Sequence, residues 1–466
     1  MSAPMSSALS QLQASRARSL AAIEARQAAV TDALLEVLAL FLLACTLLYV
    51  LIGFAPFQHD VVSYSTDTST INRWVWLGLV LLGLPILALR WRHALRLARA
   101  IWPMLLLYAW FGASTFWALD RAASVRRFLF YVVALMVFAA ISVGVRRVRA
   151  THLVLVLGTG LVVLIDLGSA IVAPGLAMTD LGLAGIHPHK NAAGAIGLYA
   201  LLAAITYWPV ARSAAARGGS AVLGGLAFVL LLLARSTTST VIALGALLVL
   251  PMLLSLLRRP ALVIAAIAAT VAGLVGVVLF LYFAWAGIEG RDALAPLAGI
   301  TFTNRIDVWA FTVSEIAKRP LLGAGFASFW DINPLVQPSL YKGYWFASDT
   351  EYTNEAHNGY LDLVATTGFI GLGLALLVLG RALFLAFRAV ARARSGGTAL
   401  FHLGFLLAFV VHNLMESSYF VPNNPFGTLL LFSALQLESW GLGPTGPSGV
   451  PSFRIGGQSP SPSFLT

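Results

Sequence analysis

The chain has 466 residues, of which 59% are hydrophobic and only 11% are charged, and its mean hydropathy is +0.86. A water-soluble fold of this size could not cover so much apolar surface, which excludes an ordinary soluble enzyme or binding module. The net charge of +11 does not indicate nucleic-acid binding, because most arginines lie in short segments between apolar runs. The single cysteine, Cys45, excludes an intrachain disulfide and a cysteine metal cluster.

Apolar runs near the length that crosses a bilayer recur along the chain and predict an all-α polytopic membrane protein with about twelve transmembrane helices. The predicted spans are 33–54, 74–89, 101–117, 128–145, 153–174, 192–210, 220–234, 240–257, 261–285, 358–380, 399–415 and 426–440. Before them, residues 1–32 are expected to form a short cytoplasmic helix without a cleavable signal. The transmembrane domain is then 33–440. The tail 441–466, rich in Pro, Gly and Ser, is expected to be a disordered cytoplasmic segment.

Basic residues recur in every second loop, which predicts the orientation in a bacterial inner membrane. With the N-terminus in the cytoplasm, the cytoplasmic loops contain Arg90, Arg92, Arg96 and Arg99; Arg146, Arg147 and Arg149; Arg212 and Arg217; Arg258 and Arg259; and Arg388, Arg392 and Arg394. Both termini are then cytoplasmic, and the largest loop, 286–356, is periplasmic.

This large loop opens with a predicted amphipathic helix over 304–317, which would lie at the membrane surface or against the spans. Its apolar face is expected to contain Ile306, Trp309, Ala310, Val313 and Ile316. The stretch 339–353 is rich in Tyr, Trp and polar residues, as is typical of a membrane interface or a sugar-binding surface.

Several basic and polar residues fall on the predicted outer side of the membrane. The positive-inside rule does not explain basic residues on that side. They are Arg126 and Arg127; His187, His189, Lys190 and Asn191; Arg235; Arg305; and His357 with Asn358. An anionic substrate is one explanation, because Arg grips phosphate oxygens through two hydrogen bonds and Lys acts as a point charge. Lipid headgroups or a solvated helix face are the alternatives, above all for the arginine pair 126–127.

His357 precedes a predicted span and follows Glu351 and Glu355. The positive end of that helix would keep its ring neutral, the form that takes a proton from a hydroxyl; a structural histidine fits the spacing equally well. No metal site is predicted, because no third ligand is fixed beside His187 and His189. Asp166 lies within a span, and an intramembrane carboxylate keeps a transporter open as an alternative.

The order of the motifs resembles the O-antigen ligase and O-antigen polymerase superfamily over roughly 116–416. The hallmark is His-Asn-Gly-Tyr-Leu at 357–361 followed by Thr-Gly-Phe-Ile-Gly at 367–371. The other matching segments are 116–120 with Ser124 and Arg127, 189–191 with Gly194, 235–239, Arg305 with Asp307 and Trp309, 320–325, and 416–417.

This resemblance implies a GT-C-like membrane glycosyltransferase that takes a glycan from undecaprenyl diphosphate on the periplasmic side, needing no cofactor, metal or nucleotide sugar. A polymerase would transfer it to another lipid-linked repeat unit, and a ligase to lipid A-core. The turns 190–191 and 235–239 favour the exopolysaccharide polymerase branch, for which a chain-length regulator would be a partner besides membrane lipids. The resemblance gives catalytic roles to Arg235, Arg305 and His357. The residues expected to bind substrate are Lys190, His189, Asn191, Asn358, Arg127, Asp307, Trp309, Glu355 and Glu416.

The expected mechanism follows from these roles. Arg235, Arg305 and Lys190 would hold the diphosphate as it leaves, and His357 or a nearby Glu would deprotonate the attacking hydroxyl, with inversion at the anomeric carbon. Two rivals stay open: a transporter of a lipid-linked or anionic solute, and a non-catalytic scaffold in polysaccharide assembly.

Overall fold

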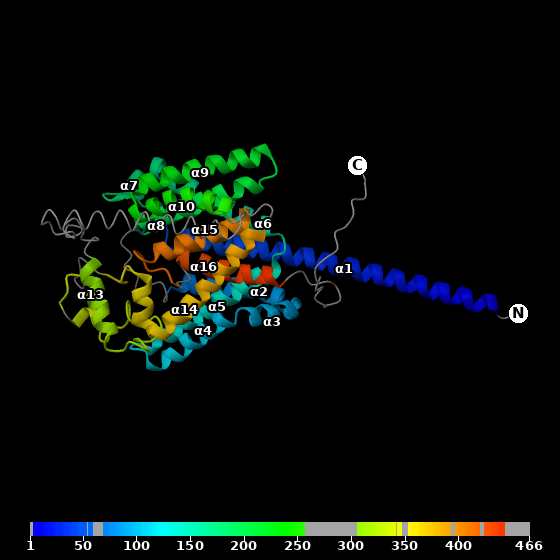
Figure 1. Cartoon of the computed structure of the whole chain (residues 1–466), viewed down its shortest axis with the longest axis horizontal. Helices are drawn as coiled ribbons and strands as arrows, with labels where there is room; N and C mark the ends of the chain where they lie inside the picture. The colour runs from blue at the N-terminus through cyan, green and yellow to red at the C-terminus, as the bar shows by residue number, and fades with distance from the viewer. Residues whose placement is uncertain are drawn as a thin grey trace.

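The computed structural model describes residues 3–53, 55–58, 69–256, 305–341, 343–346, 353–392, 397–419 and 424–442. This part of the chain is a bundle of α-helices with a single two-stranded hairpin (Figure 1). The longer helices are α1 Ala3–Ile52, α2 Thr70–Leu89, α3 Trp91–Ala100, α4 Trp102–Ser114, α5 Arg121–Gly144, α6 Val148–Val172, α8 Lys190–Tyr207, α9 Ala214–Ala234, α10 Thr237–Leu256, α13 Arg305–Ile316, α14 Gly359–Arg392, α15 Gly397–His412 and α16 Pro425–Gly441. The short elements are η2 Thr115–Trp117, α7 Pro174–Ala177, β1 Met178–Thr179, β2 Gly182–Leu183, η3 Trp208–Val210 and η5 Pro338–Tyr341.

Seven described helices are long and apolar enough to cross a membrane, or up to eight if the bent pair of α3 and α4 with η2 counts as one span. Two shorter apolar helices, Thr237–Leu253 and Gly397–His412, accompany them. Every predicted span overlaps a helix except 261–285, which lies outside the described residues. Of the predicted tail 441–466, residues 443–466 also lie outside them, and Gly441 is the last residue of α16. An all-α polytopic architecture is therefore confirmed, while the number of twelve and the GT-C-like fold stay predictions.

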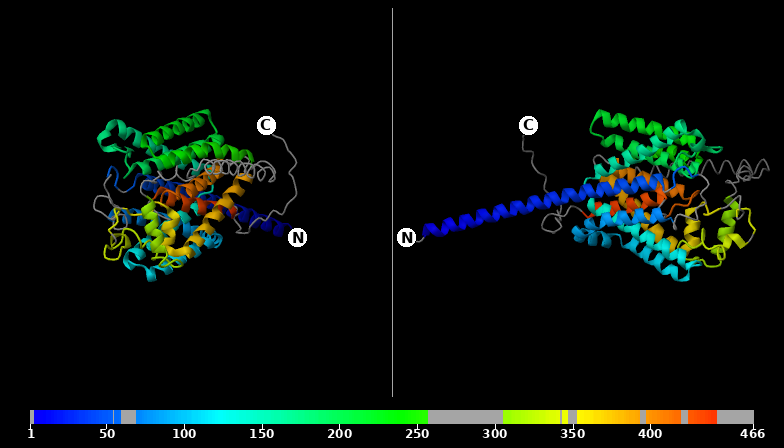
Figure 2. Two further views of the ribbon diagram at one scale, coloured as in Figure 1. Left: turned by 60° about the vertical axis from the view of Figure 1, so that its left-hand side comes forward. Right: turned by 180° about the vertical axis from the view of Figure 1, so that it is seen from behind.

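Two segments differ from the prediction. The expected short N-terminal helix is continuous with the first span, so α1 extends far beyond the bundle (Figures 1 and 2). The expected basic loop after α2 is a helix, α3, which is bent by 78° from the following one. Its arginines alternate with apolar residues at helical spacing, so this basic segment forms an amphipathic helix despite its charge.

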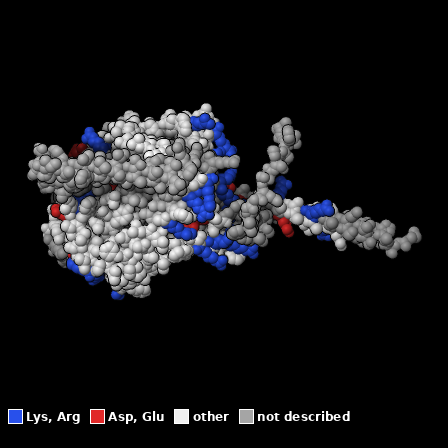
Figure 3. Space-filling model, viewed as in Figure 1, with Lys and Arg blue, Asp and Glu red and all other residues white. Residues whose placement is uncertain are grey.

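Basic side chains gather at the end of the bundle from which α1 emerges (Figure 3). Arg90 is buried there and donates to the carbonyls of Val143 and Gly144 at 3.0 and 2.7 Å, while its other amino group pairs with Asp32. Since those carbonyls are the last of α5, the guanidinium satisfies acceptors that the helix itself leaves free. The opposite end of the bundle carries α13 and the segment after it (Figures 1 and 2).

At this opposite end, a break in α14 receives the turn that follows α13. Gly368 has φ 69° and ψ −178°, and a Cβ there would lie 1.9 Å from the carbonyl oxygen of Leu321. The N–H of Phe369 donates to Pro320 O at 2.8 Å, and the N–H of Ala324 donates to Ala365 O at 2.8 Å. The segments 320–325 and 367–371 therefore pack against each other, and only glycine fits at position 368.

Helix α13 forms as predicted, but only part of its predicted apolar face packs against the protein, with Ile316 buried and Trp309 partly buried. Val308, Phe311 and Thr312 are almost fully buried, whereas Ile306 and Val313 are each 51% exposed. Phe311 contacts the rings of Phe329, Trp330, Tyr344 and Phe346. The aromatic residues of the following segment cover the side of α13 that the pattern assigned to water, so tertiary packing decided the buried face.

The segment 326–333 is fastened to the start of α5. Arg127 donates to the carbonyls of Ala327, Trp330 and Asp331 at 2.6, 3.0 and 2.6 Å. Ser124 donates to Phe326 O at 2.6 Å, and Asp120 accepts from the N–H of Asn333 at 3.1 Å. Asp120, Ser124 and Arg127 thus hold the segment that follows α13 in place.

Candidate functional site

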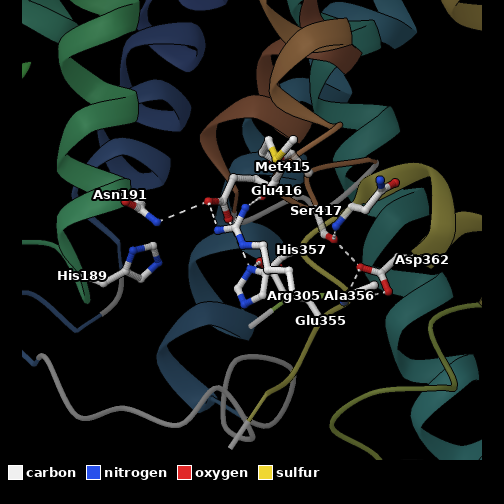
Figure 4. Close-up of polar contacts among 12 residues, drawn as sticks. His189, Asn191, Arg305, Glu355, Ala356, His357, Asp362, Met415, Glu416 and Ser417 are labelled. Atoms are coloured by element: carbon white, nitrogen blue, oxygen red, sulfur yellow. Dashed lines mark hydrogen bonds and ion pairs between the residues drawn. The ribbon is translucent and has the colours of Figure 1, made fainter. Parts of the chain in front are cut away.

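Five side chains from four separate segments meet at the α13 end of the bundle (Figure 4). They are Asn191, Arg305, Glu355, His357 and Glu416, which we call the Glu416 cluster. Glu416 lies at its centre. Its Oε1 is 2.9 Å from Nη2 of Arg305 and accepts from Nδ2 of Asn191 at 3.2 Å. Arg305 also donates to the carbonyl of Met415. The first residue of α13, the first turn of α8 and the end of α15 are thereby joined at one point.

His357 stands between two carboxylates. Its Nδ1 is 2.8 Å from Oε1 of Glu355 and 3.5 Å from Oε2 of Glu416. Burial alone would lower the pKa of His357, but the two carboxylates outweigh it and raise the pKa to about 10. Burial acts to raise the pKa of Glu416, and His357 and Arg305 overcome this and hold it well below its usual range.

The expectation that the helix end keeps His357 neutral is therefore wrong. Two carboxylates within 3.5 Å act on the ring more strongly than the partial charge of a helix end. Glu351, the other carboxylate that the sequence offered, lies outside the described residues. Glu355 is the carboxylate nearest to the ring of His357.

A turn before α8 brings Asn191 to the cluster. Asp166 is fully buried in α6, where it accepts from the N–H of Ile186 at 3.1 Å and contacts Nε2 of His187 at 2.9 Å. His189 caps α8 by accepting from the N–H of Ala192 at 3.3 Å. The carboxylate of Asp166 thus has partners that hold this turn, which gives it a structural role.

Lys190 and Arg235 lie beside the cluster without joining it. Lys190 opens α8 next to Asn191, and Arg235, exposed and with φ 51°, ends α9. The turn after Arg235 packs on the first turn of α8, since a Cβ on Gly194 would lie 2.4 Å from Cβ of Ser236. Among the described residues, no hydrogen bond or ion pair joins either cationic side chain to Glu416. Both cations remain available to an anionic group at this turn.

The other predicted site residues support the loops around the cluster. Trp309 donates to Ala356 O at 2.9 Å, and Asp307 accepts from the indole of Trp345 at 2.9 Å. Asn358 accepts from the N–H groups of Tyr360 and Leu361, both at 3.1 Å, as the cap of α14. Arg127, fastened to loop carbonyls as described above, lies outside the Glu416 cluster.

Glu355, His357 and Glu416 together offer three potential metal-ligand atoms within 4.8 Å of one another. Two carboxylates and an imidazole form a donor set that divalent cations accept. Arg305 is also paired with Glu416, and a metal bound there would have to share that carboxylate with the guanidinium.

One residue at the site, Asp362, was not predicted from the sequence. Asp362, in the first turn of α14, accepts from the N–H of Ala356 at 3.1 and 3.0 Å and from the indole of Trp330 at 2.7 Å. Ser417 also donates its hydroxyl to Asp362. The available signal was an acidic residue among apolar ones five positions after His357, at the start of a predicted span.

Residues 221–376 match the family model described as O-antigen ligase. The matched region contains Arg235, Arg305, Glu355 and His357, whereas Asn191 and Glu416 lie outside it. No curated protein matches the chain. The match supports glycan transfer of the O-antigen ligase or polymerase type in general. Over residues 221–376, it agrees with the resemblance predicted from the motifs.

Proposed function

We propose that the chain transfers glycan units from undecaprenyl diphosphate at the periplasmic face of the inner membrane, as an exopolysaccharide or O-antigen polymerase. The observation that carries this proposal is the Glu416 cluster, in which a partly buried arginine, a histidine with a raised pKa and two carboxylates meet at one end of the bundle. The cluster lies at the end opposite to the gathered arginines, which the positive-inside rule assigns to the cytoplasm (Figure 3). The termini would accordingly be cytoplasmic.

The diphosphate would bind where the cluster meets the first turn of α8. Within the cluster, Arg305 and the His357 imidazolium balance Glu355 and Glu416. The additional positive charge that a diphosphate requires is provided by Lys190 and Arg235 on the adjoining turns. Arg305 then stabilises the negative charge that develops as the diphosphate departs.

In the proposed transfer, the acceptor hydroxyl oxygen attacks the anomeric carbon, and the bond from that carbon to the diphosphate oxygen breaks. The diphosphate leaves with the electron pair, and the hydroxyl proton passes to the carboxylate of Glu355. His357 orients Glu355 and adds positive charge near the leaving group. Because a diphosphate leaves readily, no separate general acid is required, and attack from the opposite side inverts the anomeric configuration.

Transfer to lipid A-core, as a ligase performs it, uses the same donor chemistry and is the second candidate. The polymerase and the ligase differ in the acceptor, which the second half of the large loop 286–356 would hold. The aromatic group Phe329, Trp330, Tyr344 and Phe346 around Phe311 gives that segment a firm base. If the chain is a polymerase, a chain-length regulator is an expected partner.

The test is a strain that lacks the chain, complemented with wild type or His357→Ala at matched membrane levels. Extracted surface polysaccharide and lipopolysaccharide are separated on gels. We expect long polymer to disappear in His357→Ala while single repeat units persist. Polymer that stays on its lipid carrier and never reaches lipid A-core would instead identify a ligase. Wild-type products in both assays would contradict the catalytic assignment and favour the scaffold.

A further inference from the structure

His357 has a backbone conformation that residues other than glycine rarely adopt. Its φ is 50°, in the left-handed region. Such a conformation persists only where the surrounding structure imposes it, because a relaxed loop would return the residue to negative φ. The contacts on each side of His357 therefore show what holds the ring in place.

Both neighbouring peptide groups are fixed by the same pair of side chains. On one side, the N–H of Ala356 donates to both oxygens of Asp362, at 3.1 and 3.0 Å. On the other side, the N–H of Asn358 donates to Oγ of Ser417 at 3.1 Å. The hydroxyl of Ser417 donates in turn to Asp362, so one connected pair holds the chain before and after His357 (Figure 4).

The same pair also sets the position of the partner carboxylate. Ser417 follows Glu416 directly, and the N–H of Gly359 donates to Glu416 O at 3.1 Å. Asp362 is itself anchored by the indole of Trp330 at 2.7 Å. The side chain of Asp362 therefore connects the loop of His357, the loop of Glu416 and the segment after α13.

We propose that Asp362 and Ser417 are positioning residues that hold His357 in its left-handed conformation and direct its imidazole between Glu355 and Glu416. They act through His357 and contact none of the reacting atoms. This inference rests on the proposed function for its consequence in transfer, but the geometry it asserts can be measured without any glycan.

The charged and titratable groups that face His357 define a chemical readout. They are Glu355 in its own loop, Glu416 after α15, Arg305 of α13 paired with Glu416, and His189 before α8. Diethyl pyrocarbonate reacts with neutral imidazole only. A ring held between two carboxylates stays protonated and reacts slowly at pH 7, whereas a released ring returns toward the ordinary pKa and reacts quickly.

The experiment labels the purified full-length protein in detergent with diethyl pyrocarbonate at pH 7 and follows the peptides of His357 and His152 by mass spectrometry. The variants are Asp362→Asn, Ser417→Ala and Ser417→Thr, which keeps the hydroxyl. Ser220→Ala is the matched control, because it removes a buried serine hydroxyl bonded to a backbone carbonyl elsewhere. His152, buried between helices, reports loss of the whole fold.

We expect labelling of His357 to accelerate by about tenfold or more in Asp362→Asn and Ser417→Ala, the size expected when the pKa falls by at least one unit. His152 should stay unlabelled, and Ser417→Thr and Ser220→Ala should match wild type. Unchanged labelling of His357 in both variants would overturn the proposal. So would parallel labelling of His152, since the pair would then hold the bundle rather than the loop. An absence of glycan transfer in wild type would refute the proposed function and leave this result intact.

Discussion

Nη2 of Arg305 and Oε1 of Glu416 lie 2.9 Å apart, with side chains only 13% and 12% exposed. An ion pair this well buried fixes the guanidinium in one orientation, because an unpaired partner would be left without solvent. A diphosphate that binds Arg305 must share it with Glu416 or displace that carboxylate. In the proposed function, the pair therefore holds the arginine in place for the diphosphate.

Arg305→Lys tests whether the planar fork of the arginine is needed. Lysine keeps the charge but not the two parallel donors, so we expect transfer from lipid-linked glycan to fall by about 10- to 100-fold. The measurement is the initial rate of transfer in isolated membranes. Arg319→Lys, at an exposed position just after α13, is the matched control and should keep the wild-type rate. Equal rates for both variants would remove Arg305 from the catalytic group.

His357 predicts a pH dependence of stability. Because the folded-state pKa is raised to about 10, the charged ring stabilises the folded protein fully below its unfolded pKa, near 6.5. This contribution is lost as the pH rises from about 6.5 to about 10. The melting temperature of wild type should therefore exceed that of His357→Gln most at pH 6, and the difference should shrink toward pH 10. A difference that grows with pH would show that the ring is neutral in the folded protein.

Gly368→Ala tests the packing of the α14 break against the turn after α13. The added Cβ would lie 1.9 Å from Leu321 O, and φ 69° disfavours any side chain. We expect a loss of about 1–3 kcal/mol of stability, seen as a lower melting temperature in detergent. Gly380→Ala is the matched control in the same helix, where a Cβ would meet no atom within 4 Å. A similar loss in both would mean that the break is not the cause.

Much of this architecture could be predicted from the sequence, because its signals are local. Apolar runs gave most helices, and the glycines at 323 and 368 marked positions where the chain packs closely. The buried face of α13 could not be predicted, since it depends on Phe329 and Phe346 folding back onto Phe311. Of the two carboxylates that raise the pKa of His357, Glu355 is the stronger and stands only two positions before it, whereas Glu416 comes from 59 positions further along the chain, and no local pattern contains that second contact.

Arg127→Gln tests whether Arg127 binds substrate or only holds the segment 327–331. Its guanidinium contacts three backbone carbonyls of the segment 327–331, so Arg127→Gln should leave buried acceptors unsatisfied and cost about 1–3 kcal/mol. We expect faster proteolysis within that segment, with the KM for the lipid-linked donor changed by less than about threefold once folded protein is matched. A large rise in KM with unchanged proteolysis would return Arg127 to the substrate-binding group that its motif implied.

Asp166 provides the corresponding test for the turn before α8. Asp166→Asn keeps an oxygen for the N–H of Ile186 but puts an amide NH2 group where a carboxylate oxygen contacts Nε2 of His187, so the melting temperature should fall. Transfer per folded molecule should stay within about threefold of wild type, because Asn191 still reaches Glu416 through its own helix. Asp180→Asn, at an exposed position between β1 and β2, is the matched control and should change neither quantity.

Complete loss of surface polysaccharide in Asp166→Asn with an unchanged melting temperature would instead give this carboxylate a direct part in moving substrate. That outcome would restore the transporter reading, since a structural partner of His187 cannot abolish function without weakening the fold.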